Sequence, residues 1–84
     1  MKSNFVKIGG LYKINTSCLF FEENKTKIKS FNVLPYIRPD EYFIIIECNE
    51  HFPLKTKILF EFKILWQNRL GKVYLTEENL LEIK

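Results

Sequence analysis

The sequence predicts a mostly β protein, folded as a single small β-barrel domain of 84 residues. The chain contains no alanine, the best helix former, while isoleucine and the aromatic residues that suit strands are abundant. The C-terminal part, 62–83, reads as strand, tight turn, short strand, polar helical turn and last strand. Apolar residues make up 46% of the chain, which is enough for a core without disulfides or metal.

The N-terminal part begins with a turn and a first strand. Gly9 and Gly10 tolerate a positive φ and predict a turn at this point. We expect the first strand at 11–15 and a short extended segment at 18–21. The polar residues 22–25 then predict a second turn.

Residues 25–31 alternate strictly and place Lys25, Lys27 and Lys29 on one face of an extended chain. One interpretation is a basic rail for phosphates or anionic surfaces. The other is an exposed sheet edge, where lysines discourage aggregation between strands. The lysine face has no interleaved aromatic residues, which favours the protected edge.

The middle of the chain holds a long loop and the most apolar strand. Pro35 and Pro39 predict that 34–40 is irregular, because proline fixes φ and removes a backbone donor. The segment 42–48 is apolar on both faces over most of its length, so we expect a central strand covered on both sides. A loop over 49–55 should follow.

The clearest alternation in the sequence lies at 57–67 and predicts a strand with one aromatic-rich face in the core. The residues of this face are Phe60, Phe62, Ile64 and Trp66. A tight turn at 68–71 should lead to a short antiparallel strand at 72–75. Threonine and two glutamates then predict a single helical turn at 76–79, before a last strand at 80–83.

This order of elements resembles the Src-homology-3-like small β-barrels of the kind found in bacteria and tailed phages. The resemblance is carried by Trp66 to Ile83, with a hairpin ending in Gly71, an apolar strand, a polar turn and a final Leu-Leu-Glu-Ile. Residues 6–14 look like the entry strand of bacterial and phage versions. The resemblance implies a five-stranded, partly open barrel, with a long loop after the first strand and one short helical turn before the last.

The chain departs from the peptide-binding members of that family. Those members carry acidic residues in the first long loop, and a proline and a tyrosine in the helical turn. Here the first long loop is basic, no proline precedes 76–79, and Leu80 takes the place of the tyrosine. Trp66 ends its strand and is expected in the core. The resemblance therefore does not imply recognition of proline-rich peptides.

Charge and hydropathy exclude several classes of protein. The net charge of +3 divides into +4 for residues 1–40 and −1 for residues 41–84, well short of the basic patch of a dedicated nucleic-acid binder. The longest apolar run, 42–46, is too short to span a bilayer, and the N-terminal residues do not form a signal peptide. We expect a cytoplasmic protein or a virion component, with no membrane partner.

The sequence holds little material for catalysis or metal binding. Cys18 and Cys48 could form one disulfide by number alone, but without a secretion signal two small buried hydrophobes are expected. His51 and Cys48 would be an imaginable base and nucleophile, yet Cys48 faces the core, where thiols are inert. Two cysteines and one histidine do not make a structural zinc site. We expect no enzyme, no metal and no cofactor.

The sequence therefore indicates a non-catalytic structural or protein-interaction module, acting on a protein partner or on its own copies. The candidate contacts are apolar side chains in loops or on outward positions, namely Tyr36, Ile37, Phe52 and Tyr74. The alternative is a small basic-faced barrel that binds nucleic acid. Its candidate contacts are the cations Lys25, Lys27, Lys29 and Arg38.

Overall fold

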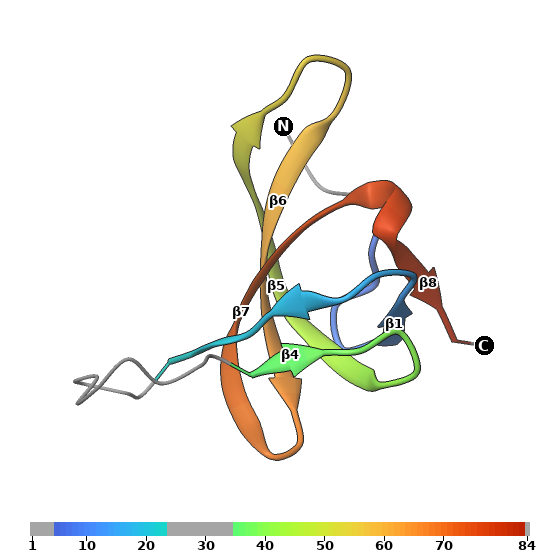
Figure 1. The fold of residues 1–84 in the computed structure, drawn as a ribbon, viewed down its shortest axis with the longest axis vertical. Helices are drawn as coiled ribbons and strands as arrows, with labels where there is room; N and C mark the ends of the chain where they lie inside the picture. Colours follow the sequence, from blue (N-terminus) through green and yellow to red (C-terminus); the bar gives the residue numbers. More distant parts are fainter. Residues whose placement is uncertain (1–4, 24–34, 84) are drawn as a thin grey trace.

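The structure is a computed structural model that describes residues 5–23 and 35–83. Strands dominate it, with one short 3-10 helix near the C-terminus (Figure 1). The elements in chain order are β1 (Leu11–Ile14), β2 (Cys18–Leu19), β3 (Phe21–Glu22), β4 (Tyr36–Ile37), β5 (Tyr42–Pro53), β6 (Ile58–Trp66), β7 (Arg69–Thr76), the 3-10 helix η1 (Glu77–Asn79) and β8 (Leu80–Glu82). The prediction of a mostly β protein is confirmed.

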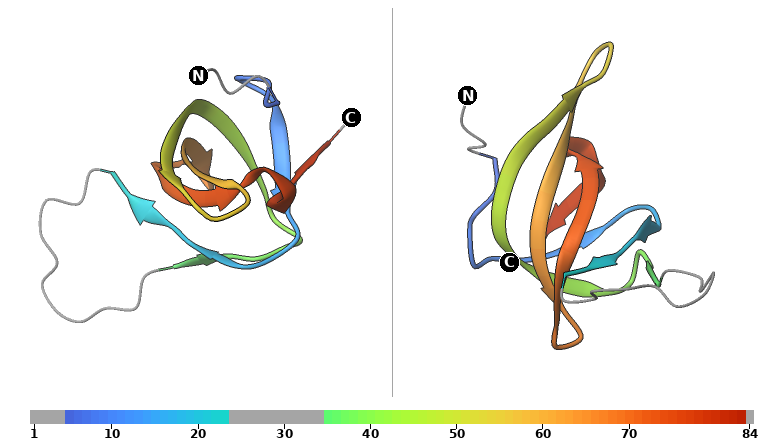
Figure 2. Two further views of the ribbon diagram at one scale, coloured as in Figure 1. Left: turned by 90° about the horizontal axis from the view of Figure 1, so that it is seen from above. Right: turned by 90° about the vertical axis from the view of Figure 1, so that its left-hand side faces the viewer.

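Six of the strands form one antiparallel sheet in the order β3-β7-β6-β5-β1-β8, and β2 pairs with β4 in a separate ribbon. The long strands curl around a common interior, as the view from above shows (Figure 2). Within the described residues, β3 and β8 are the two edges of the sheet. The five strands expected from the sequence are all present as β1, β5, β6, β7 and β8.

The core lies on the inner face of the curled sheet, as the alternation in β6 predicted. The inner side chains of β6 are buried from Phe60 to Trp66 and meet those of the neighbouring strands. The core residues are Tyr12, Ile14, Phe20, Ile37, Phe43, Ile45, Phe60, Phe62, Ile64, Trp66, Val73 and Leu75. The Trp66 ring packs 4.9 Å from the Phe20 ring, centroid to centroid, so the prediction of a core tryptophan is confirmed.

The turn between β6 and β7 lies earlier than predicted. Trp66 pairs with Arg69, so Gln67 and Asn68 alone form a two-residue hairpin loop. Both have positive φ, at 51° and 63°, as a type I′ turn requires. Gly71, expected to end the turn, instead lies within β7, opposite Ile64. A Cβ atom there would approach Phe20 Cζ to 2.4 Å, so this glycine serves close packing.

Strand β5 is longer than predicted and replaces most of the loop expected at 49–55. Its pairing with β6 shifts register between Ile45 and Glu47 and again between Glu50 and Phe52. Such bulges bend a strand and increase its twist, which allows β5 to follow the curl of the sheet. The outer face of β5 is only partly covered by the described residues, since Ile44 and Ile46 are half-buried and Tyr42 is 53% exposed; the expectation of cover on both sides is met only in part.

The long excursion between β1 and β5 contains more structure than a loop. Tyr36 and Ile37, expected to be irregular, pair with β2 in antiparallel register, and the Phe20 N–H donates to the Pro35 carbonyl at 2.9 Å. Strand β3 crosses to the large sheet and pairs with β7. Lys25, Lys27 and Lys29, with the alternating segment they occupy, lie outside the described residues.

The glycine pair makes the predicted turn at the start of the chain. Gly9 has a φ of 86°, and its N–H donates to the Ile45 carbonyl at 2.7 Å. The Ile45 N–H in turn donates to the Gly10 carbonyl at 3.2 Å. The phenol of buried Tyr12 accepts a 2.7 Å hydrogen bond from the Lys7 N–H. These bonds hold the N-terminal turn against β5.

Candidate functional site

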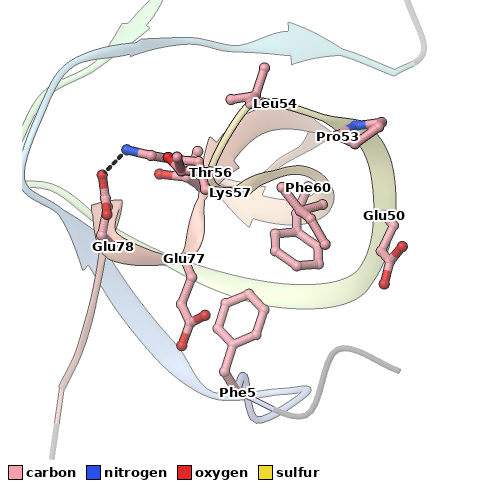
Figure 3. Close-up of a pocket in the computed structure, with 11 residues that line it drawn as sticks. Phe5, Glu50, Pro53, Leu54, Thr56, Lys57, Phe60, Glu77 and Glu78 are labelled. Carbon is pink, nitrogen blue, oxygen red and sulfur yellow. Dashed lines mark hydrogen bonds and ion pairs between the residues drawn. The ribbon is translucent and has the colours of Figure 1, made fainter. Parts of the chain in front are cut away.

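A cleft of about 830 Å³ opens between the tip of the β5–β6 hairpin and η1 (Figure 3). The hairpin forms one wall and the 3-10 turn forms the other, while the N-terminal segment closes the bottom. Its apolar lining residues are Phe5, Pro53, Leu54, Ile58 and Phe60. Its polar lining residues are Glu50, Thr56, Lys57, Thr76, Glu77 and Glu78. An apolar floor with a few convergent polar groups is typical of a binding site.

The floor of the cleft is aromatic. The rings of Phe5 and Phe60 lie 4.8 Å apart between centroids, and the Phe5 ring also lies 6.3 Å from that of Phe62 (Figure 3). Phe60 and Phe62 are buried and belong to the core, whereas Phe5 is half-buried. The floor is thus a continuation of the core that stays partly open to solvent.

Glutamates dominate the charge of the cleft. The Lys57 ammonium forms an ion pair with Glu78 that joins the two walls (Figure 3). Glu50 and Glu77 are exposed and have no ion-pair partner in the part of the chain that the structure describes. With three carboxylates and one ammonium, the cleft carries a net charge of −2.

Hydrogen bonds to Asn15, the residue after β1, fix the position of η1. The Thr76 N–H and hydroxyl both donate to Asn79 Oδ1, at 3.1 and 2.9 Å, which caps the turn at its start. The Asn79 Nδ2 donates to Asn15 Oδ1 at 3.2 Å, and the Asn15 Nδ2 donates to the Glu78 carbonyl at 3.0 Å. The predicted single helical turn is confirmed, and these bonds explain why its two glutamates face the cleft wall.

The side chains predicted as a contact surface lie on separate elements. Tyr36 on β4 and Phe52 on β5 are 55% and 57% exposed, as expected. In Figure 1, β4 and the tip of the β5–β6 hairpin lie at opposite ends of the molecule. Arg38 is exposed, and its backbone N–H donates to Glu41 Oε1 at 3.1 Å.

The prediction that Ile37 points outward is wrong. Its exposed fraction is 0%, and it is part of the hydrophobic core. Pairing with Cys18 turns alternate side chains of the short ribbon inward and outward, so Ile37 is buried while its neighbour Tyr36 is exposed. The prediction of an irregular loop at 34–40 gives no alternation of buried and exposed side chains, so it does not identify Ile37 as a core residue.

Tyr74 lies on the outer face of β7 within a polar and aromatic cluster. Its hydroxyl donates to Glu61 Oε2 at 2.9 Å, and the Lys72 ammonium lies 3.6 Å from the same oxygen. The rings of His51 and Phe21 lie 4.8 and 5.8 Å from the Tyr74 ring, centroid to centroid. Its neighbours thus hold the Tyr74 ring in place, and none of these contacts belongs to the cleft.

Tyr74 makes the stability of the fold sensitive to alkaline pH. Burial raises the pKa of its phenol above the ordinary value of 10.0, and the hydrogen bond and charge of Glu61 raise it further. A raised pKa in the folded state gives stability that is complete below the unfolded pKa and is lost as the pH rises through the folded pKa. We expect the stability gap between wild type and Tyr74→Phe to stay level below about pH 9 and to shrink as the pH rises above about 10.

Urea unfolding across that pH range measures the gap directly. Tyr42→Phe is the matched control, because Tyr42 is an exposed tyrosine whose ring has Lys13 Nζ 5.9 Å from its centroid. Among residues 5–23 and 35–83, no carboxylate accepts a hydrogen bond from its hydroxyl. The effect belongs to the Tyr74–Glu61 contact if the gap shrinks more for Tyr74→Phe than for Tyr42→Phe. If the free energies of unfolding of wild type and Tyr74→Phe run parallel against pH, the hydrogen bond from the phenol to Glu61 does not contribute to stability as expected.

The two cysteines and the histidine have different surroundings. Burial raises the pKa of the Cys18 thiol to about 11, which keeps it protonated and unreactive at neutral pH. Cys48 packs against the core, whereas His51 is exposed and stacks on Tyr74, although it lies in β5 and not in the expected loop. Across residues 5–23 and 35–83, no group of three metal-ligating side chains is found.

The sequence did not point to the cleft. In the sequence, Glu77 and Glu78 indicate only the start of a helical turn. Glu50 lies 27 positions before Glu77 and shares no motif with it. They come together because β5 and β7 curl around the same interior. One signal was present: apolar Leu54 and Phe52 flank a proline, which is more apolar surface than a solvated loop needs.

No helix in the described part of the chain is long and apolar enough to cross a membrane. Comparisons of the chain with protein-family models, with curated proteins and with solved structures find no match.

Proposed function

We propose that the protein is a non-catalytic protein-interaction module of the Src-homology-3-like class, which holds a segment of a partner protein in the cleft between the β5–β6 hairpin and η1. The observation that carries the proposal is the cleft itself, an apolar floor continuous with the core and open to solvent. Partner side chains entering it would bury apolar surface without any rearrangement of the strands.

The strand order supports the barrel class. Strands β7, β6, β5, β1 and β8 follow one another in the sheet, with a long excursion after β1 and a single 3-10 turn before β8. This is the arrangement that the resemblance implies. The cleft differs from the peptide groove of that family, since its carboxylates come from β5 and η1 and not from the first long loop.

Leu54 offers the sharpest test of the cleft. It lines the cleft on the hairpin wall and is 43% exposed, so Leu54→Ser should not unfold the protein. We would select binders to the immobilised protein from a displayed library of random dodecapeptides. Leu54→Ser should weaken their binding by about tenfold, since apolar contact with one leucine is worth about 1.4 kcal/mol or more.

Leu81→Ser is the matched control, because Leu81 is 41% exposed on β8 and does not line the cleft. It should change the affinity by less than about twofold. Selected peptides that are indifferent to Leu54→Ser, or a library that yields no binder, would contradict the proposal.

The alternative function, nucleic-acid binding, depends on Lys25, Lys27, Lys29 and Arg38. The exposure of Arg38 is compatible with it. The cleft does not favour it, because carboxylates repel phosphates. A gel shift at low and moderate salt decides between the two, and binding at low salt that fades with added salt would favour nucleic acid.

A further inference from the structure

We infer that the partner segment held in the cleft presents a lysine or arginine side chain to Glu50 and Glu77, with its aliphatic stem against the Phe5–Phe60 floor. The inference rests on the proposed function and adds the chemistry of the occupant. It is carried by three features of the cleft: its unmatched carboxylates, its aromatic floor, and the way it already holds a lysine of its own.

The charge of the cleft selects for a cation. Glu50 extends from β5 on one side, and Glu77 extends from η1 beside the Phe5 ring (Figure 3). Within residues 5–23 and 35–83 neither carboxylate has an ion-pair partner, so each is available to an incoming ammonium or guanidinium. An anionic segment would meet a net charge of −2 there and be repelled.

The floor suits the rest of such a side chain. Lysine and arginine bury their methylene stems along apolar surface while the charged head stays among polar groups. The half-buried Phe5 ring attracts a cation placed above its face, which adds to the effect of the carboxylates. A purely apolar ligand would use the floor but leave the two glutamates partly desolvated without a partner.

Lys57 shows how the cleft accommodates an ammonium. It lines the cleft from the hairpin side and reaches across to Glu78, so its charge is matched at the opposite wall (Figure 3). The remaining carboxylates of the lining, Glu50 and Glu77, form no ion pair with a cation of the described chain. A partner lysine or arginine would supply the missing positive charge.

The test uses the dodecapeptides that bind wild type and lose affinity with Leu54→Ser. Each should contain a lysine or arginine whose replacement by norleucine, which keeps the aliphatic stem, weakens binding by about tenfold. With the variant Glu50→Gln/Glu77→Gln, that loss should shrink to about twofold. Glu82→Gln is the control: Glu82 is exposed on β8 outside the cleft, and its removal should leave the tenfold loss intact.

The outcomes separate the two proposals. Peptides that depend on Leu54 but bind equally well with norleucine would overturn the cationic occupant and leave the cleft as the interaction site. A tenfold loss on norleucine substitution that persists in Glu50→Gln/Glu77→Gln would likewise overturn the cationic occupant and leave the cleft as the interaction site. If no selected peptide depends on Leu54, the proposed function fails, and the inference about its occupant fails with it.

Discussion

Replacing Gly71 by alanine is expected to lower the free energy of unfolding by about 3 kcal/mol, because the new methyl group has no room. Its carbon would lie 2.4 Å from Phe20 Cζ and 2.6 Å from Phe20 Cε1. It would also lie 2.6 Å from the backbone oxygen of Phe21, which cannot simply move aside because β3 pairs with β7 at this point. Either β3 separates from the sheet edge or the Phe20 ring leaves its place against Trp66.

Urea unfolding measures the loss, with Leu70→Ala as control. Leu70 is the neighbouring residue of β7 and is exposed on the outer face, so its truncation should cost less than about 1 kcal/mol. A double-mutant cycle with Phe20→Leu adds a positive test: in the Gly71→Ala background the smaller side chain should cost less than in wild type. A Gly71→Ala variant within about 0.5 kcal/mol of wild type would show that the sheet edge is not packed this closely.

The sequence predicted the parts of the fold that rest on long periodic segments. In β6 four buried residues alternate with partly exposed ones over nine positions, so the strand, its inner face and the core position of Trp66 followed directly. The single turn before β8 followed from Thr76 and the two glutamates, since cap chemistry is local. Both the alternation in β6 and the cap residues can be recognised without knowing which distant residues they contact.

The errors fall where local signals are weak or misleading. Strands β2, β3 and β4 have two residues each, too few to show a period, and their pairing is decided by tertiary contacts. The sequence predicts a hairpin turn that ends at the glycine, yet Gln67 and Asn68 adopt the positive φ, and the missing side chain of Gly71 leaves room for Phe20. The sequence shows that a glycine is needed but does not show whether a turn or close packing needs it.

The cleft could be recognised only from the three-dimensional arrangement of the chain. Phe5, Glu50 and Glu77 are separated by 45 and 27 positions and have no common motif. They meet because the bulges in β5 bend it, the hairpin tip extends beyond the core, and Asn15 holds η1 in place. The strongest sign of the cleft is that β5 continues to Pro53 and carries the exposed Phe52 near its end. The sequence predicts a loop at 49–55, so this sign is visible only in the structure.

Truncation of Ile37 to alanine is expected to cost about 3 kcal/mol, the middle of the range for a fully buried isoleucine. For a domain of this size that corresponds to a fall in Tm of about 15 °C. Ile37 belongs to a strand of only two residues, and its side chain attaches the β2–β4 ribbon to the core together with Phe20 and Cys18. Without it, the ribbon loses its one buried side chain from β4, and less apolar burial offsets the entropy of ordering the two short strands.

Tyr36→Ala provides the comparison within the same strand. Tyr36 is 55% exposed, and its change should lower the free energy of unfolding by less than about 1 kcal/mol. Thermal unfolding followed by circular dichroism measures both variants. Equal effects of the two changes would mean that the alternation assigned to β4 is wrong. A large effect of Ile37→Ala alone would place the β2–β4 ribbon within the cooperative fold.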